Sequence, residues 1–310
     1  MPFLFIIDFE MQRPLALPLS EVRNGDILFS INGFTNAQSP RPYSMVTGLH
    51  FSSDRSSMSI KEYQSKFNHV VHHLKHGDSY LANLTVKTRV ETNRSLKQLF
   101  FLSRARFKLW FKNEFLVFSP ERFIQIKDCK IVSFPMKGTI DASLPNAHKS
   151  ILTNPKELAE HVTIVDLIRN DLSLVSSSVS VKRFRYLEEV KTHNKTLLQV
   201  SSEIQGNLPP DYHTKIGDIL VSLLPAGSVS GAPKGKTVQI LRNAEGENRD
   251  YFTGVFGYFD GDNLDTGVMI RYIEKTNAGL FFRSGGGITA QSIMESEYQE
   301  AMDKVYVPVY

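Results

Sequence analysis

Two kinds of hydrophobic pattern run along the chain, and they predict different elements. Short apolar runs bounded by turn residues are typical of strands. They lie mainly before residue 127 and after residue 251, at 1–8, 26–32, 80–90, 106–111, 114–118, 123–126, 252–260, 265–274 and 279–284. Apolar residues with a helical period predict helices at 59–76, 155–172, 188–206 and 211–223, and a last helix from about residue 293.

The order of these elements predicts the fold class. Strand runs and helix runs are mixed without strict alternation, which favours an α+β fold with a large antiparallel sheet component. A cluster of serines at positions 52, 53, 56, 57 and 59 is interpreted as a boundary. We therefore expect an N-terminal region at 1–58, packed on or continuous with the core, and a main domain at 59–310.

Composition narrows the class of protein. The 310 residues are 41% hydrophobic and 22% charged, as in ordinary globular proteins, and no apolar run approaches the ~18 residues that span a membrane. Cys129 is the single cysteine, so neither an internal disulfide nor a cysteine-rich metal site can form, and a reducing cytoplasm is expected. The net charge of +4 comes without basic tracts, which argues against nucleic acid and suits a small anionic substrate.

Two pairs of glutamates recur at a spacing of three residues. Glu157 and Glu160 follow an Asn-Pro helix start, and Glu297 and Glu300 follow Ser292, a candidate helix cap. A spacing of three places both members of a pair on one helix face. Each pair taken alone is more typical of helix capping or of surface pairing, for example between Glu300 and Lys304. Together the four carboxylates could bind Mg²⁺, which prefers oxygen ligands.

Two glycine-rich segments are candidates for ligand binding. Residues 225–237 end in Gly-Lys-Thr, but only three residues separate Gly231 from Gly235 where a phosphate loop needs four, so that reading is rejected. As a turn before a helix, the segment could still present backbone amides to a ligand. The run 285–287 joins a predicted strand to the last helix and could grip a carboxylate, with Arg271 as a bidentate partner. Alternatively, residues 285–287 are only a connection between two elements, and Arg271 is only a surface arginine.

Taken together, these segments resemble the chorismate-utilising enzymes, a family that includes anthranilate, aminodeoxychorismate, isochorismate and salicylate synthases. The similar stretches keep the family's order from about residue 60 to the end. They are 157–171, 225–234, 252–258, 265–271, 284–292 and 297–300. The resemblance implies a core of large antiparallel sheets packed in tandem and flanked by helices.

Within the family, two further segments resemble the aminodeoxychorismate synthases. They are 119–123, with Glu121, and 135–139, with Lys137. Lys137 is the position at which anthranilate synthases carry alanine. The resemblance implies that Glu121 protonates the departing C4 hydroxyl of chorismate and that Lys137 adds at C2 before ammonia replaces it.

The resemblance also implies the rest of the site. Mg²⁺ would be held by Glu157, Glu160, Glu297 and Glu300, and the substrate would contact Ser230, Gly231, Arg271, Gly285, Gly287 and Lys304. The product, 4-amino-4-deoxychorismate, leads to 4-aminobenzoate and folate. Ammonia would come from a separate glutaminase subunit or from solution, because no glutaminase portion is recognisable.

One departure from the family keeps an alternative open. Gln199 stands where the family usually has histidine. A non-catalytic chorismate-binding subunit is therefore one alternative, although Glu121, Lys137 and the four glutamates are all retained. Anthranilate synthase is another, and Lys137 argues against it. No lysine pattern for isochorismate or salicylate synthase is found.

Overall fold

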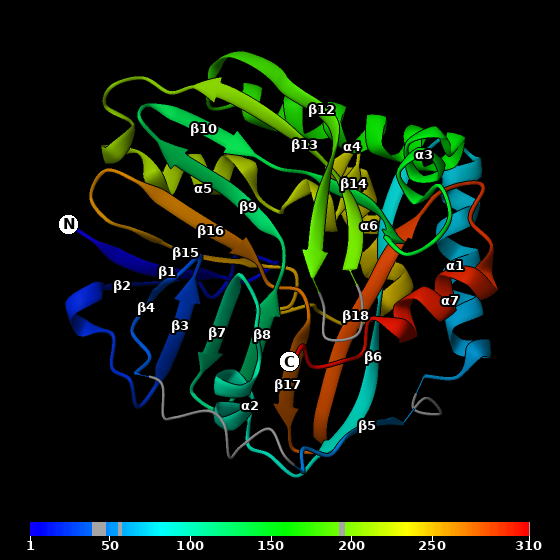
Figure 1. Ribbon diagram of the computed structural model, residues 1–310, viewed down its shortest axis with the longest axis horizontal. Coiled ribbons are helices and arrows are strands. Elements are labelled where there is room, and N and C mark those ends of the chain that lie inside the picture. The colour runs from blue at the N-terminus through cyan, green and yellow to red at the C-terminus, as the bar shows by residue number, and fades with distance from the viewer. Residues whose placement is uncertain (39–47, 55–57, 192–195, 310) are drawn as a thin grey trace.

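The computed structural model describes residues 1–38, 48–54, 58–191 and 196–309, which form two antiparallel sheets between layers of helices (Figure 1). The prediction of an α+β fold with tandem sheets flanked by helices is confirmed. Within these residues the helices are α1 (Ile60–Lys75), α2 (Leu96–Leu102), α3 (Ala147–Thr153), α4 (Pro155–Ser173), α5 (Ile216–Leu223), α6 (Lys234–Glu245) and α7 (Met294–Asp303).

Sheet A has nine strands within the described residues. Eight follow the order β11-β13-β10-β9-β16-β15-β1-β2, and β12 pairs with β13. Their bounds are β1 (Phe3–Ile7), β2 (Leu15–Pro18), β9 (Arg122–Lys127), β10 (Lys130–Ser133), β11 (Met136–Asp141), β12 (Ser177–Lys191), β13 (Thr196–Asn207), β15 (Val255–Phe259) and β16 (Leu264–Val268).

Sheet B also has nine strands in the described part of the chain. Eight follow the order β14-β6-β18-β17-β8-β7-β3-β4, and β5 pairs with β6. Their bounds are β3 (Ile27–Ile31), β4 (Phe34–Thr35), β5 (Phe51–Asp54), β6 (Leu81–Thr92), β7 (Phe107–Phe111), β8 (Phe115–Ser119), β14 (Gly231–Ala232), β17 (Tyr272–Thr276) and β18 (Gly279–Ile288).

Strand β1 shows how the layers are held together. Its side chains alternate, so Leu4 and Ile6 face sheet B while Phe5 and Ile7 face α4 and α5. A strand buried on both faces reads as a continuous apolar run, as residues 3–7 do. The N-terminal region thus supplies strands to both sheets and is continuous with the core. Two serines of the expected boundary, at positions 56 and 57, lie outside the described residues.

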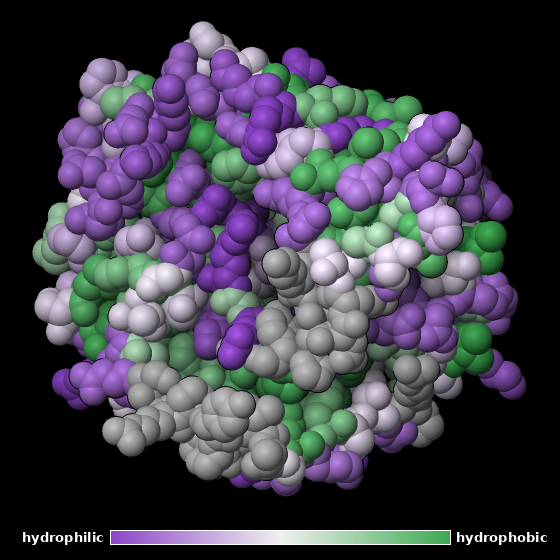
Figure 2. Space-filling view, viewed as in Figure 1, coloured by the Kyte–Doolittle hydropathy of each residue, from purple (hydrophilic) through white to green (hydrophobic). Residues whose placement is uncertain are grey.

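The outer helices cover the second face of each sheet. Apolar residues of α1, α6 and α7 pack on β6 and β18 of sheet B, and those of α2 pack on β7 and β8. Hydrophilic side chains predominate over the outer strands β12 and β13 in the upper part of the face in Figure 2. No helix among the described residues is long and apolar enough to span a membrane.

The prediction of a helix at 188–206 is wrong, because this stretch belongs to β12 and β13. In β13, Leu198, Val200 and Ile204 are buried with a period of two, and this alternation outweighs the helix-forming residues around it. Residues 192–195 between the strands lie outside the described residues. Tertiary pairing with β11 and β10 fixes the strand conformation.

Three smaller expectations also need correction. The predicted strand 265–274 is two strands, β16 and β17, in different sheets, because the chain turns at Arg271 with a φ of 53°. Residues 285–287 lie inside β18 rather than in a connection. Ser292 does not cap α7, whose N-cap is Ile293; the Ser292 hydroxyl instead accepts from the Thr289 amide at 3.1 Å.

Candidate active site

The candidate residues converge where one edge of sheet A meets one edge of sheet B. Among the described strands of sheet A, β11 pairs only with β13, and β14, β6 and β18 are neighbours at the end of sheet B. The ends of α4 and α7 reach the same region. The helices and strands that carry predicted site residues therefore meet here. The other predicted residues lie beside such elements: Glu121 and Arg271 on the loops after β8 and β16, Ser230 just before β14 and Lys304 just after α7.

An irregularity in β11 orients Lys137. The register of β11 against β13 shifts between Met136 and Thr139, and the bulge carries Lys137 and Gly138. Bulges commonly redirect a side chain beside an active site. Gly138 has a φ of 89°, and a Cβ there would come within 2.7 Å of Glu157 Oε2. Glycine therefore permits both the bulge and the close approach of Glu157.

Lys137 is surrounded by carboxylates. Its Nζ lies 3.0 Å from Glu160 Oε2. Burial acts to lower the pKa of Lys137, but the charge and hydrogen bond of Glu160, with the charges of Glu300 and Glu157, outweigh burial and raise it. This is opposite to the deprotonation expected for a nucleophile. The ammonium must therefore lose its proton before Lys137 can act as an amine.

The two glutamate pairs lie on α4 and α7 as predicted. The Asn154 side chain caps α4 by accepting from the Glu157 amide at 3.2 Å, while Glu160 and Glu297 are buried. Carboxylates of both helices act on the charge of Lys137, so the pairs face a common region. No three His, Cys, Asp or Glu side chains in the described ranges are grouped closely enough to hold a metal ion. The oxygen donors nevertheless fit the chemistry of Mg²⁺.

Gly286 and Gly287 of β18 expose the strand surface to these groups. A Cβ on Gly286 would lie 3.7 Å from Glu300 Oε1 and 3.8 Å from Glu297 Oε2, and one on Gly287 would lie 2.9 Å from Lys137 Nζ. Gly286 was not among the predicted residues, although it lies between two that were. It is the glycine that faces the α7 glutamates.

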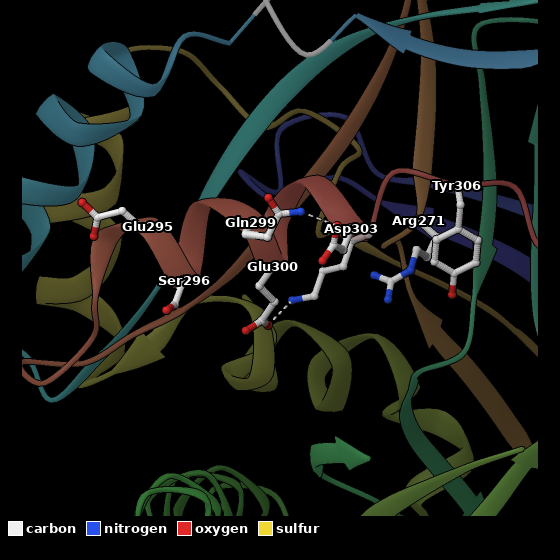
Figure 3. Close-up of a pocket in the computed structure, with 8 residues that line it drawn as sticks. Arg271, Glu295, Ser296, Gln299, Glu300, Asp303 and Tyr306 are labelled. Atoms are coloured by element: carbon white, nitrogen blue, oxygen red, sulfur yellow. Dashed lines mark hydrogen bonds and ion pairs between the residues drawn. The ribbon is translucent and has the colours of Figure 1, made fainter. Parts of the chain in front are cut away.

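Lys304 and Arg271 place positive charge at a cavity of about 570 Å³. Lys304 Nζ donates to the Gly285 carbonyl at 2.8 Å and to Glu300 Oε1 at 2.7 Å. Figure 3 shows Arg271 beside the ring of Tyr306, with its Cζ 5.6 Å from the ring centroid. The Arg271 Nε is buried and has no hydrogen-bond partner. The cavity is lined by Arg271, Glu295, Ser296, Gln299, Glu300, Asp303, Lys304 and Tyr306.

The surroundings of Glu121 favour the protonated form of its carboxyl group. Burial raises its pKa, and this outweighs a hydrogen bond from Ser228 and the charges of Arg271, Lys137 and Lys304, which all act to lower it. The Ser228 hydroxyl donates directly to Glu121 Oε1. Ser228 was not predicted as a site residue, although it lies in the glycine-rich segment 225–237 that was singled out.

Ser230 and Gly231 lie in the glycine-rich segment, which packs against β6. The Ser230 hydroxyl is buried and donates to the Ala226 carbonyl at 2.8 Å. Gly231 has a φ of 144°, and a Cβ there would come within 2.0 Å of the Leu81 carbonyl oxygen. Their positions show how the segment is folded against β6; substrate contact by either residue stays a prediction. Gln199 lies in β13 opposite Thr139 of β11, next to the bulge.

Known proteins resemble the chain in sequence and in fold. Residues 32–309 match the family model described as chorismate binding enzyme. A Haemophilus influenzae protein described as an uncharacterized PabA-like protein is 48% identical over 99% of this chain and 92% of its own length. Aminodeoxychorismate synthase component 1 of Klebsiella aerogenes is 34% identical over 81% of this chain and 58% of its own length. The menaquinone-specific isochorismate synthase of Escherichia coli shares the fold, with a TM-score of 0.74 at 15% identity over 98% of this chain and 77% of that one.

Proposed function

The chain belongs to the chorismate binding enzyme family, and on that premise we propose that it replaces the C4 hydroxyl of chorismate by an amino group. The product is 4-amino-4-deoxychorismate, which leads to 4-aminobenzoate and folate. The observation that carries the proposal is the position of Lys137. A bulge in β11 directs its side chain to a place between Glu160 and the bare face of Gly287. An amine in this position suits covalent catalysis on a ring carbon.

Two cations and a metal ion would together bind a dianionic substrate. Arg271 has a buried Nε without a partner, and a substrate carboxylate would supply one. Lys304 is fixed by the Gly285 carbonyl and Glu300. Mg²⁺, held by Glu157, Glu160, Glu297 and Glu300, would supply positive charge to a carboxylate of the ring substrate.

The reaction follows from an acid and an amine in one site. Glu121, with its raised pKa, donates a proton to the C4 hydroxyl, which leaves as water. The neutral amine of Lys137 adds at C2, and the ring double bond shifts as the C4–O bond breaks. Ammonia then forms a bond to C4, the double bond shifts back, and the C2–N bond to Lys137 breaks, so that Lys137 leaves as the amine. The proton lost by the ammonia nitrogen restores the carboxylic acid of Glu121. One ammonia is consumed and one water is released.

A second component would deliver the ammonia. The similarity to a protein named component 1 supports an assembly of more than one chain. We therefore propose a separate glutaminase partner, with free ammonium as a substitute in vitro.

Product analysis tests the proposal. Purified protein is incubated with chorismate, Mg²⁺ and ammonium, and products are identified by mass spectrometry. Aminodeoxychorismate is expected from the wild type and not from Lys137→Ala. Lys130→Ala, at an exposed lysine of β10, is the matched control and keeps full activity.

The other outcomes are equally definite. Formation of anthranilate would show that the protein is an anthranilate synthase and that Lys137 does not have the proposed role. Binding of chorismate, measured by calorimetry, without any turnover would support a non-catalytic binding subunit. In that case Gln199 would stand where the reaction needs a histidine.

A further inference from the structure

We propose that Asn83 contacts the substrate, donating a hydrogen bond from its carboxamide to a substrate oxygen beside Lys137. The inference rests on the proposed function and extends it to a residue outside the segments 225–237 and 285–287. Asn83 lies in β6 directly opposite Gly287 of β18.

The position of Asn83 places its side chain next to the lysine. A Cβ on Gly287 would lie 3.6 Å from Asn83 Oδ1 and 2.9 Å from Lys137 Nζ. The carboxamide oxygen of Asn83 and the amine of Lys137 therefore border the same bare glycine, and a half-turn of the planar carboxamide would bring Nδ2 to this place. A ring that lies over this glycine would touch both groups.

The Asn83 carboxamide has an unmet donor. Its Nδ2 is buried and has no hydrogen-bond partner. Leaving a buried donor unpaired destabilises the folded state, so such a group calls for an explanation. Arg271 Nε, at the carboxylate-binding end of the site, is in the same condition. Both donors would be satisfied by oxygens of a bound substrate.

The backbone of Asn83 is held from two sides, which fixes the direction of its side chain. Its amide donates to the Ser230 carbonyl at 2.9 Å, and its carbonyl accepts from Arg249 Nη2 at 2.6 Å. Arg249 is itself buried and paired with Glu245, at 2.6 Å. Glu245 Oε1 also accepts from the Thr85 amide at 2.9 Å, two residues along the same strand. A residue fixed so firmly, with its carboxamide donor unpaired, is suited to positioning a ligand.

The chemistry of asparagine suits this place. Lys137 is already balanced against several carboxylates, and a neutral carboxamide adds hydrogen bonds without adding charge. Its two N–H groups select an oxygen acceptor, whether a carboxylate, a hydroxyl or an ether. Aspartate at this position would have no N–H to donate and would repel a carboxylate.

Two substitutions separate a substrate contact from a structural role. In Asn83→Leu an apolar side chain of similar size removes the unpaired donor, so the melting temperature is expected to stay constant or rise. At the same time kcat/KM for chorismate is expected to fall about 10- to 100-fold, as for loss of a hydrogen bond to a charged group. Asn83→Asp keeps the shape and should lose at least as much activity.

Asn93→Asp is the matched control, because Asn93 follows the far end of β6 and its carboxamide bonds to residues 48 and 50. This variant should keep wild-type kcat/KM. Unchanged kcat/KM in both Asn83 variants would overturn the inference. So would a loss of activity that only follows a lowered melting temperature.

The proposed function is tested separately by the wild type. If the wild type binds chorismate without turnover, calorimetry replaces kinetics, and a 10-fold weaker Kd in Asn83→Leu supports the contact. Wild-type protein that turns chorismate over while both Asn83 variants match it would leave the proposed function standing and overturn only the Asn83 contact. Wild-type protein that does not bind chorismate at all overturns both.

Discussion

Three consecutive glycines in β18 have three different neighbours. A Cβ on Gly285 would meet the backbone of β6, with the Leu84 carbonyl oxygen at 2.4 Å. A Cβ on Gly287 would meet the end of the Lys137 side chain. Backbone in a paired strand cannot move aside cheaply, whereas a lysine side chain can rotate.

Alanine at these two positions should therefore have opposite consequences. Gly287→Ala is expected to fold with a nearly unchanged melting temperature but to lose at least ten-fold in kcat/KM, because Lys137 is displaced. Gly285→Ala is expected to lower the free energy of unfolding by about 2 kcal/mol. Thermal denaturation and steady-state kinetics of both variants check this, and a stable, active Gly287→Ala would contradict it.

The pH dependence of the reaction should report Glu121. Its pKa is raised by burial, and the protonated form is the one that donates a proton, so Glu121 controls the limb of the pH profile in which activity is lost as pH rises through this pKa. The hydrogen bond from Ser228 lowers the pKa of Glu121, so Ser228→Ala should shift this loss of activity to higher pH. Profiles of kcat/KM against pH for both proteins test the expectation. A shift to lower pH would contradict it.

At the scale of elements, sequence predicted best where local chemistry decides. Helix α4 begins at the Asn-Pro-Lys-Glu signal that predicted it, and Gly77 follows α1 in the left-handed conformation. The helix prediction at 188–206 failed because these residues lie in β12 and β13, which pair with each other, and β13 also pairs with β10 and β11. The latter pairing joins segments more than 50 residues apart, and composition of the stretch does not encode it.

In the candidate site, too, local features were predictable and tertiary contacts were not. Helical spacing correctly put Glu157 with Glu160, and Glu297 with Glu300, on the same helix. That the two helices approach one lysine depends on the tertiary fold, and only the family resemblance anticipated it. Gly138, Ser228 and Gly286 were missed as individual residues because their roles depend on a bulge, a hydrogen bond to Glu121 and a facing helix.

At the scale of the whole molecule, the two sheets depend on each other. Strand β1 contributes to the apolar clusters on both faces of sheet A. Arg122 and Asp265 of sheet A form a bidentate pair, at 2.8 and 3.1 Å, and Asn32 beside β3 of sheet B donates to the same carboxylate at 3.1 Å. A shared core with polar links between the layers favours cooperative unfolding.

The two sheets are therefore expected to unfold in one transition. Trp110, the single tryptophan, is buried in β7 of sheet B, so its fluorescence reports on that sheet alone. Far-ultraviolet circular dichroism reports on both sheets. Denaturation curves from the two signals should coincide. Midpoints that differ beyond experimental error would show that the sheets unfold separately.

The place of β1 also has a consequence for synthesis in the cell. Strand β1 pairs with β2 on one edge, but Phe3 pairs with Phe259 on the other, so that edge waits for a partner made about 250 residues later. At about 5–20 residues per second, that delay lasts roughly 12–50 s. During this time an apolar segment with unpaired backbone groups is exposed on the nascent chain. We expect this protein to depend on chaperones that bind early in translation.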